Sequence, residues 1–106
     1  FPLWLAPEQV SILPISEKYH GYAHQVFTEL QVRNISGKID ERDEKIGRKI
    51  RDAEMQKIPF MLIVGEKESD EGLVSVRSHG KGDQGAMKVA SFIEFFEAEA
   101  GKFINN

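Results

Sequence analysis

Two oppositely charged residues, Glu68 and Arg77, lie nine positions apart in the second half of the chain. A carboxylate can accept hydrogen bonds from the donor edge of guanine, and an arginine can fork onto the carbonyl oxygens of a base. These two residue types would therefore suit an unpaired base. The simpler alternative, on residue types alone, is an ion pair within a β-hairpin.

A run of basic residues precedes this pair. Residues 42–57 hold six basic and four acidic side chains, whereas residues 66–72 hold one lysine and four acids. The net charge of the whole chain is −3, which argues against a general polyanion-binding protein. The sequence therefore predicts a basic helix next to an acidic turn. The six basic residues of the helix are Arg42, Lys45, Arg48, Lys49, Arg51 and Lys57.

Most catalytic and metal-binding signatures are absent from the sequence. The chain contains no cysteine, which excludes disulfides and thiolate metal sites. It has no glycine-rich phosphate loop after a strand, no nucleophile elbow and no His-Glu zinc motif. His20 and His24 are four residues apart and could share a helix face, but no third ligand lies near them in the sequence. We expect neither a metal site nor a catalytic residue.

Hydrophobic periodicity predicts alternating strands and helices that would position the charged residues. The run Phe60–Val64 is uninterrupted apolar, as in a central strand covered on both faces, and Gly65 ends it. Glu68 would then follow the carboxyl end of that strand, where α/β sheets usually bind ligands. The expected strands are 10–15, 38–40, 60–64, 72–77 and 86–88, and the expected helices are 19–32, about 44–58 and 89–104.

The order of these elements predicts one α/β domain of three layers, α/β/α, with a mixed sheet. The first three strands would be joined by right-handed crossovers, and the segment GKGDQG would be a hairpin turn. A chain of 106 residues without an internal linker is expected to form one domain, residues 1–106. No apolar run approaches the roughly 18 residues of a membrane span, so we expect a soluble, cytoplasmic protein.

Several segments together resemble the C-terminal anticodon-binding domain of threonyl-tRNA synthetase, a class II aminoacyl-tRNA synthetase. They occur in the same order and spacing as in that family, and they cover nearly the whole chain. The resemblance implies a five-stranded mixed sheet with three helices, in which the first strand lies centrally and the fourth is antiparallel. The segments are FPLWLAPEQV, LPISEKY, DEKIGRKIRDAEMQKIPFMLIVGEKE and VSVRS.

The resemblance also implies which residues contact RNA. Glu68 and Arg77 fall where the family recognises anticodon bases, and the other matched positions would contact the anticodon loop or its backbone. Threonine anticodons end in G and then U, a pair that a carboxylate and an arginine suit. At residue 43 the family has an asparagine that is expected to contact the anticodon. This chain has Asp43, which lacks the amide donors and repels phosphate, so the resemblance does not extend to that contact. The remaining expected RNA-binding residues are Arg51, Lys57, Asp43, Lys45 and Lys49.

By the same resemblance, the partners are the anticodon stem-loop of threonine tRNA and a catalytic domain that this chain lacks. Residues 1–7, with several large apolar side chains, would form the junction with that domain. The parent enzyme would be a homodimeric threonine-tRNA ligase that uses ATP, Mg and Zn, whereas this segment holds no cofactor and no active site. The alternatives are a synthetase-like accessory domain for protein binding, or the anticodon domain of a prolyl-, glycyl- or histidyl-tRNA synthetase.

Overall fold

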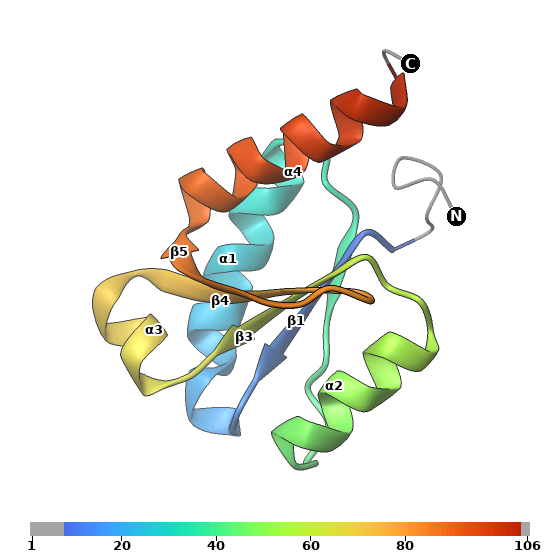
Figure 1. Ribbon diagram of the computed structural model, residues 1–106. Helices are drawn as coiled ribbons and strands as arrows, with labels where there is room; N and C mark the ends of the chain where they lie inside the picture. Colours follow the sequence, from blue (N-terminus) through green and yellow to red (C-terminus); the bar gives the residue numbers. More distant parts are fainter. Residues whose placement is uncertain (1–7, 105–106) are drawn as a thin grey trace.

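The computed structural model describes residues 8–104, which form one mixed sheet with helices on both faces (Figure 1). The predicted junction, residues 1–7, lies outside the described residues. The strands are β1 (Val10–Pro14), β2 (Gly37–Ile39), β3 (Phe60–Val64), β4 (Leu73–Ser78) and β5 (Gly82–Lys88). The helices are α1 (His20–Val32), α2 (Ile46–Met55), α3 (Glu66–Glu71) and α4 (Val89–Ile104), and a 3-10 turn, Glu17–Tyr19, precedes α1.

The strand order is β2-β1-β3-β4-β5, with β1 parallel to both of its neighbours and β4 antiparallel to β3 and β5. This confirms the mixed five-stranded sheet, the interior position of the first strand and the antiparallel fourth strand. The apolar run of β3 forms the middle strand, as its continuous hydrophobicity predicts.

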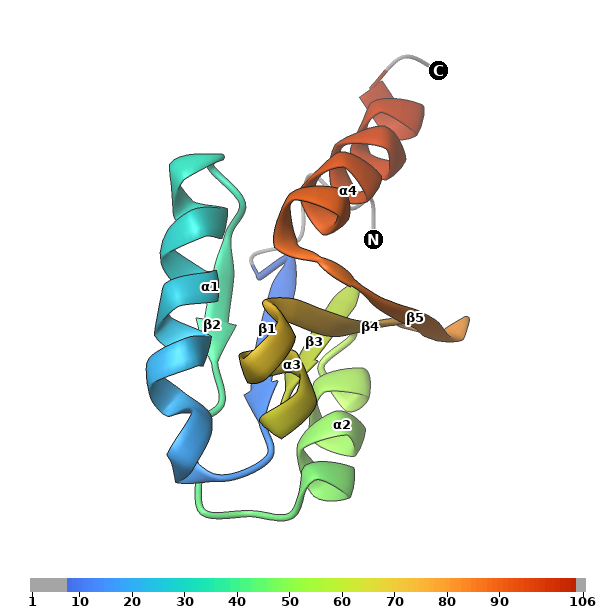
Figure 2. The same cartoon turned by 90° about the vertical axis from the view of Figure 1, so that its left-hand side faces the viewer.

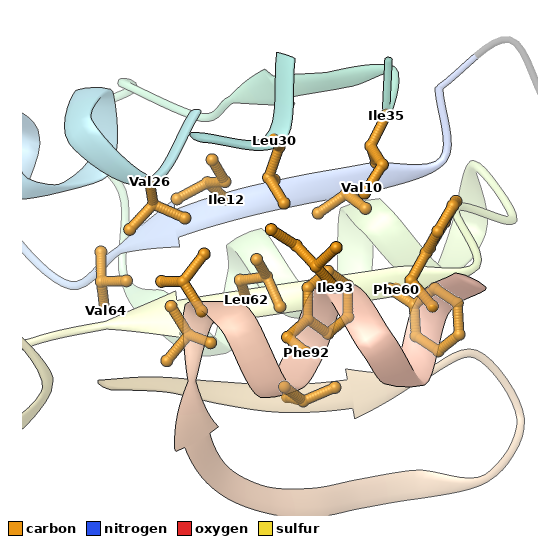
Figure 3. Packing of buried hydrophobic residues seen from close by; sticks show 14 of the residues in the cluster. Val10, Ile12, Val26, Leu30, Ile35, Phe60, Leu62, Val64, Phe92 and Ile93 are labelled. Carbon is orange, nitrogen blue, oxygen red and sulfur yellow. The ribbon is translucent and has the colours of Figure 1, made fainter. Parts of the chain in front are cut away.

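Alternation along the strands divides the core into two layers. Val10, Ile12 and Leu62 face α1 and α4, whereas Leu13 and Met61 face α2. Figure 2 shows β1 and β3 between α1 and α2, and Figure 3 shows the larger of the two clusters. Its aromatic part centres on Phe60, whose ring lies edge-on to Phe92, Phe95 and Phe96 at centroid distances of 5.6, 5.6 and 5.8 Å.

Three details differ from the sequence prediction. Helix α2 spans Ile46–Met55 and is shorter at both ends than the expected 44–58. The segment after β3 is not a simple turn, because residues 66–71 form the short helix α3, so the described chain has four α-helices where three were expected. The fifth strand begins at Gly82 instead of residue 86, so four of the six residues of the expected hairpin turn GKGDQG belong to β5. A register shift opposite Val76 and Arg77 accommodates one extra residue in that strand.

Candidate nucleic-acid interface

The α2 side of β4 carries polar side chains. Val74 and Val76 point into the core on the opposite face, so Ser75 and Arg77 point to the side on which α2 packs. Ser75 lies opposite Ile63 in the β3–β4 pair, and Arg77 lies opposite Met61. Arg77 is thus about 7 Å along the strand from Ser75, on the same face.

Glu68 is fixed to this face by both of its carboxylate oxygens. Oε1 accepts a hydrogen bond from the backbone N–H of Gly65 at 2.8 Å, and Oε2 accepts one from Ser75 Oγ at 2.9 Å. The first bond joins the start of α3 to its third residue, and the second joins α3 to β4. Each oxygen of a carboxylate can accept two hydrogen bonds, so Glu68 retains the capacity to accept from a ligand.

Gly65 leaves room for this arrangement. A Cβ atom at residue 65 would lie 2.8 Å from Ile15 Cδ1 and 3.2 Å from Glu68 Oε1. The first distance is too short for carbon atoms, and the second requires the carboxylate to move. A side chain at this position would therefore displace Glu68.

Arg77 makes no ion pair with Glu68 in the part of the chain that the structure describes. The simpler interpretation from sequence, a hairpin ion pair, is therefore wrong. Arg77 is half-buried, and its Nε atom is buried without a hydrogen-bond partner among the described residues. Because Nε is enclosed, a ligand would have to contact the remainder of this half-buried side chain.

The basic residues around α2 divide into paired and unpaired groups. Arg42 forks onto Asp40, with Nε 2.9 Å from Oδ1 and Nη2 2.8 Å from Oδ2, and its Nη1 lies 3.0 Å from Asp52. Arg48 lies 3.9 Å from Glu44 and 3.8 Å from Asp52. Within the described residues, exposed basic side chains without an ion pair remain at Lys45, Arg51 and Lys57.

These three residues and Asp43, which the family resemblance predicts to contact RNA, are all exposed. Lys45 immediately precedes the first turn of α2, and Asp43 lies exposed in the loop before it. Arg51 lies exposed within α2, and Lys57 follows the helix with a left-handed backbone, φ 59°. The exposed positive charges are thus arranged along α2.

Lys49 is the exception among the expected RNA-binding residues. Its side chain is 1% exposed, and its Nζ donates to the carbonyl oxygens of Pro14 at 2.9 Å and Asp40 at 3.1 Å. The expected phosphate contact is therefore not available to it in this structure. The sequence contained the signal, because residue 49 falls three or four positions from the apolar residues at 46 and 53 on one helix stripe.

Residues 9–99 match the family described as "Anticodon binding domain". The chain belongs to that anticodon-binding domain family. It is 57% identical over 102 residues to the threonine--tRNA ligase of Cytophaga hutchinsonii and 58% identical over 105 residues to that of Bacteroides fragilis. These matches cover 96% and 99% of the chain, and the chain spans only 16% of either relative.

A solved structure agrees with this assignment of the anticodon-binding domain. The RNA-binding domain of threonyl-tRNA synthetase from Cryptosporidium parvum aligns with a TM-score of 0.87 at 30% identity, covering 93% of this chain and 25% of that one. The fold predicted from sequence is therefore confirmed. Between residues 8 and 104, no helix is long and apolar enough to cross a bilayer.

Hydrogen bonding and burial shift the pKa values of Asp40 and Tyr22 in this anticodon-binding domain. The hydrogen bonds from Arg42 lower the pKa of Asp40 below its ordinary 3.8, against the opposing effect of partial burial. Burial raises the pKa of Tyr22, and the carboxylates of Glu29 and Glu68 raise it further. Tyr22 remains a neutral phenol whose hydroxyl donates to the Leu73 carbonyl at 2.7 Å, which ties α1 to the start of β4.

Two of the three histidines, His20 and His24, flank a carboxylate that sequence spacing did not reveal. Glu41 Oε2 lies 3.7 Å from His20 Nδ1, and its Oε1 lies 3.4 Å from His24 Nε2. The three residues link α1 to the loop between β2 and α2. Among the described residues, no group of histidine and acidic side chains has the arrangement of a metal site.

Proposed function

We propose that this chain is the anticodon-binding domain of a threonyl-tRNA synthetase, and that it recognises the anticodon loop of threonine tRNA. The names of its relatives support threonine as the amino acid of the parent synthetase, since the matched ligases and the solved RNA-binding domain are named as threonyl enzymes. The parent enzyme would be a threonine-tRNA ligase of the cytoplasm, and its catalytic domain, ATP site and dimer interface would lie outside this chain.

The observation that carries the proposal is the pairing of functional groups on the α2 side of β4. Glu68 is held by two hydrogen bonds with acceptor capacity remaining, and Arg77 on the same side is half-buried and makes no ion pair with any described residue. A guanine presents two adjacent donors and a carbonyl oxygen on its Watson–Crick edge, which match a carboxylate and a guanidinium. We infer that these two residues recognise an unstacked base.

The exposed basic residues around α2 would contribute to RNA binding in a different way from Glu68 and Arg77. Lys45, Arg51 and Lys57 are positively charged and make no ion pair with any described residue, and such side chains contribute affinity through phosphates, not sequence discrimination. The loop residue Asp43 has no donor to offer a base and repels phosphate, so we propose that it contributes less than an asparagine would.

Binding of labelled anticodon stem-loops at several salt concentrations tests the proposal. Arg77→Ala should weaken cognate binding by about 1–3 kcal/mol and reduce the preference over a loop with one changed anticodon base. Lys45→Ala should weaken binding to both loops equally and lower the salt slope by about 1.

Arg33→Ala is the matched control, because Arg33 is an exposed arginine at the end of α1, the helix that covers the other face of the sheet. It should leave affinity and preference unchanged. If the unaltered chain binds cognate and altered loops equally, it does not recognise the anticodon, and a role as an accessory protein-binding domain becomes the better explanation.

A further inference from the structure

Lys49 places a charged ammonium group at a buried position of α2. It lies on the apolar stripe of α2 and is 1% exposed, where an aliphatic side chain would pack without a charge. Burying an ammonium is costly unless hydrogen bonds compensate for lost water. Its bonds to Pro14 and Asp40 are to backbone carbonyl oxygens, and no ion pair involves it within the described chain.

The two carbonyl oxygens belong to the ends of two neighbouring strands. Pro14 is the last residue of β1, and Asp40 follows the last residue of β2. The ammonium therefore connects the first turn of α2 to both strands at the edge where the loop of residues 40–45 begins. That loop leads directly into α2 and carries Asp43 and Lys45.

Packing alone does not hold the loop against α2. A hollow of about 300 Å³ lies between them, and Ser11, Asp40, Arg42, Lys49 and Asp52 contribute to its lining. Besides the Lys49 contacts, the loop is held by the Arg42 ion pairs, by the contacts of Glu41 with His20 and His24, and by the backbone bond Asp40 N–Ile12 O at 2.9 Å. Arg42 and Glu41 are each half exposed, whereas Lys49 is enclosed.

We propose that Lys49 is a positioning residue that holds the loop of residues 40–45 in the orientation in which Asp43 and Lys45 meet the RNA. This inference rests on the proposed function. Lys49 touches no RNA itself and acts through the loop. Glu68 is held by its bonds to Gly65 and Ser75, and Arg77 lies in the β3–β4 pair, so their base recognition would not depend on Lys49.

The first test measures the loop without RNA. Lys49→Met keeps the length and packing of the side chain and removes the ammonium. Amide hydrogen exchange at Asp40, Arg42 and Glu44, whose N–H groups all donate hydrogen bonds, should accelerate more than exchange at Gly65 and Ser69 near α3. Equal acceleration at both places would show a general loss of stability and would overturn the proposal.

The second test uses double-variant binding to the cognate stem-loop. If Lys49 acts through the loop, Lys49→Met should weaken binding by itself, yet add less than about a twofold loss when Lys45→Ala is already present. Combined with Arg77→Ala, its effect should be fully additive. Additivity with both variants would indicate a direct or global effect and would overturn the proposal.

Ala53→Gly is the control, because it destabilises the same helix and leaves the ammonium in place. It should lower the melting temperature without changing binding below that temperature. A stem-loop that does not bind the unaltered chain would refute the proposed function, whereas normal binding by Lys49→Met would refute only the positioning role.

Discussion

The replacement Glu68→Gln distinguishes the contribution of this side chain to folding stability from its contribution to RNA recognition. In the folded chain, a glutamine oxygen can still accept from Gly65 N–H, and its amide can donate to Ser75 Oγ, since a hydroxyl also accepts. Both hydrogen bonds survive in neutral form, so the free energy of unfolding should fall by less than about 1 kcal/mol.

The replacement should reduce the free energy of RNA binding more than the free energy of unfolding. The amide nitrogen or the remaining oxygen can face the ligand, but the pair of acceptors that guanine donors require is gone. One guanine donor then faces an amide N–H, which costs about 1–3 kcal/mol, or roughly 5-fold to 150-fold in Kd. Binding of the cognate stem-loop should therefore fall while the melting curve changes little.

Fluorescence anisotropy with two stem-loops isolates the contact. One loop carries guanine at the middle anticodon position, and the other carries inosine, which lacks the exocyclic amine. The unaltered chain should prefer guanine, and Glu68→Gln should show little preference. Glu66→Gln, in the exposed first turn of the same helix, is the matched control. A full preference for guanine in Glu68→Gln, with stability unchanged, would refute the base contact.

Two further expectations concern the supports of the site. Gly65→Ala should lower the free energy of unfolding by about 1 kcal/mol, because Ile15 is 42% exposed and can swing aside, yet it should weaken cognate binding by displacing Glu68. Urea unfolding together with stem-loop titration measures both. The Arg42 bonds lower the pKa of Asp40, so its stabilising effect is present above pH 3.8 and is lost as the pH falls through the lower folded value. In urea unfolding at decreasing pH, Asp40→Asn should lose less stability than the unaltered chain below pH 3.8, and a difference in slope near pH 6 would contradict this.

Elements with continuous apolar patterns could be predicted from sequence. The strand at 60–64 and the helix at 89–104 have the predicted bounds, because Pro59 and Gly65 delimit the first and a long apolar stripe defines the second. Helix α3 could not be predicted, since its six residues are all polar. It depends on tertiary bonds from Glu68 and on Gly72, which ends it with a left-handed backbone, φ 70°.

The sequence shows the chemical type of each candidate site residue, but it does not show the environment of the side chain. Residue chemistry and family resemblance named Glu68 and Arg77 as candidates, but their placement on one side of the sheet depends on the Glu68–Ser75 hydrogen bond and on the register of β4, which the sequence does not show. A count of basic residues likewise treated Lys49 as equivalent to Lys45. Burial distinguishes them, because one belongs to the apolar stripe of α2 and the other precedes it.

The position of β1 between two parallel partners has a consequence for how the chain acquires its structure. β1 pairs with β2 and then with β3, whose residues follow it by about 25 and 50 positions in the sequence, whereas β4 and β5 are joined by a short turn. Pairings that close long loops form slowly. During synthesis, the apolar β1 would therefore remain without a partner on its β3 side until residue 64 has left the ribosome. We expect the order of folding to start from the β3–β4–β5 meander and α4, and to end with the insertion of β1.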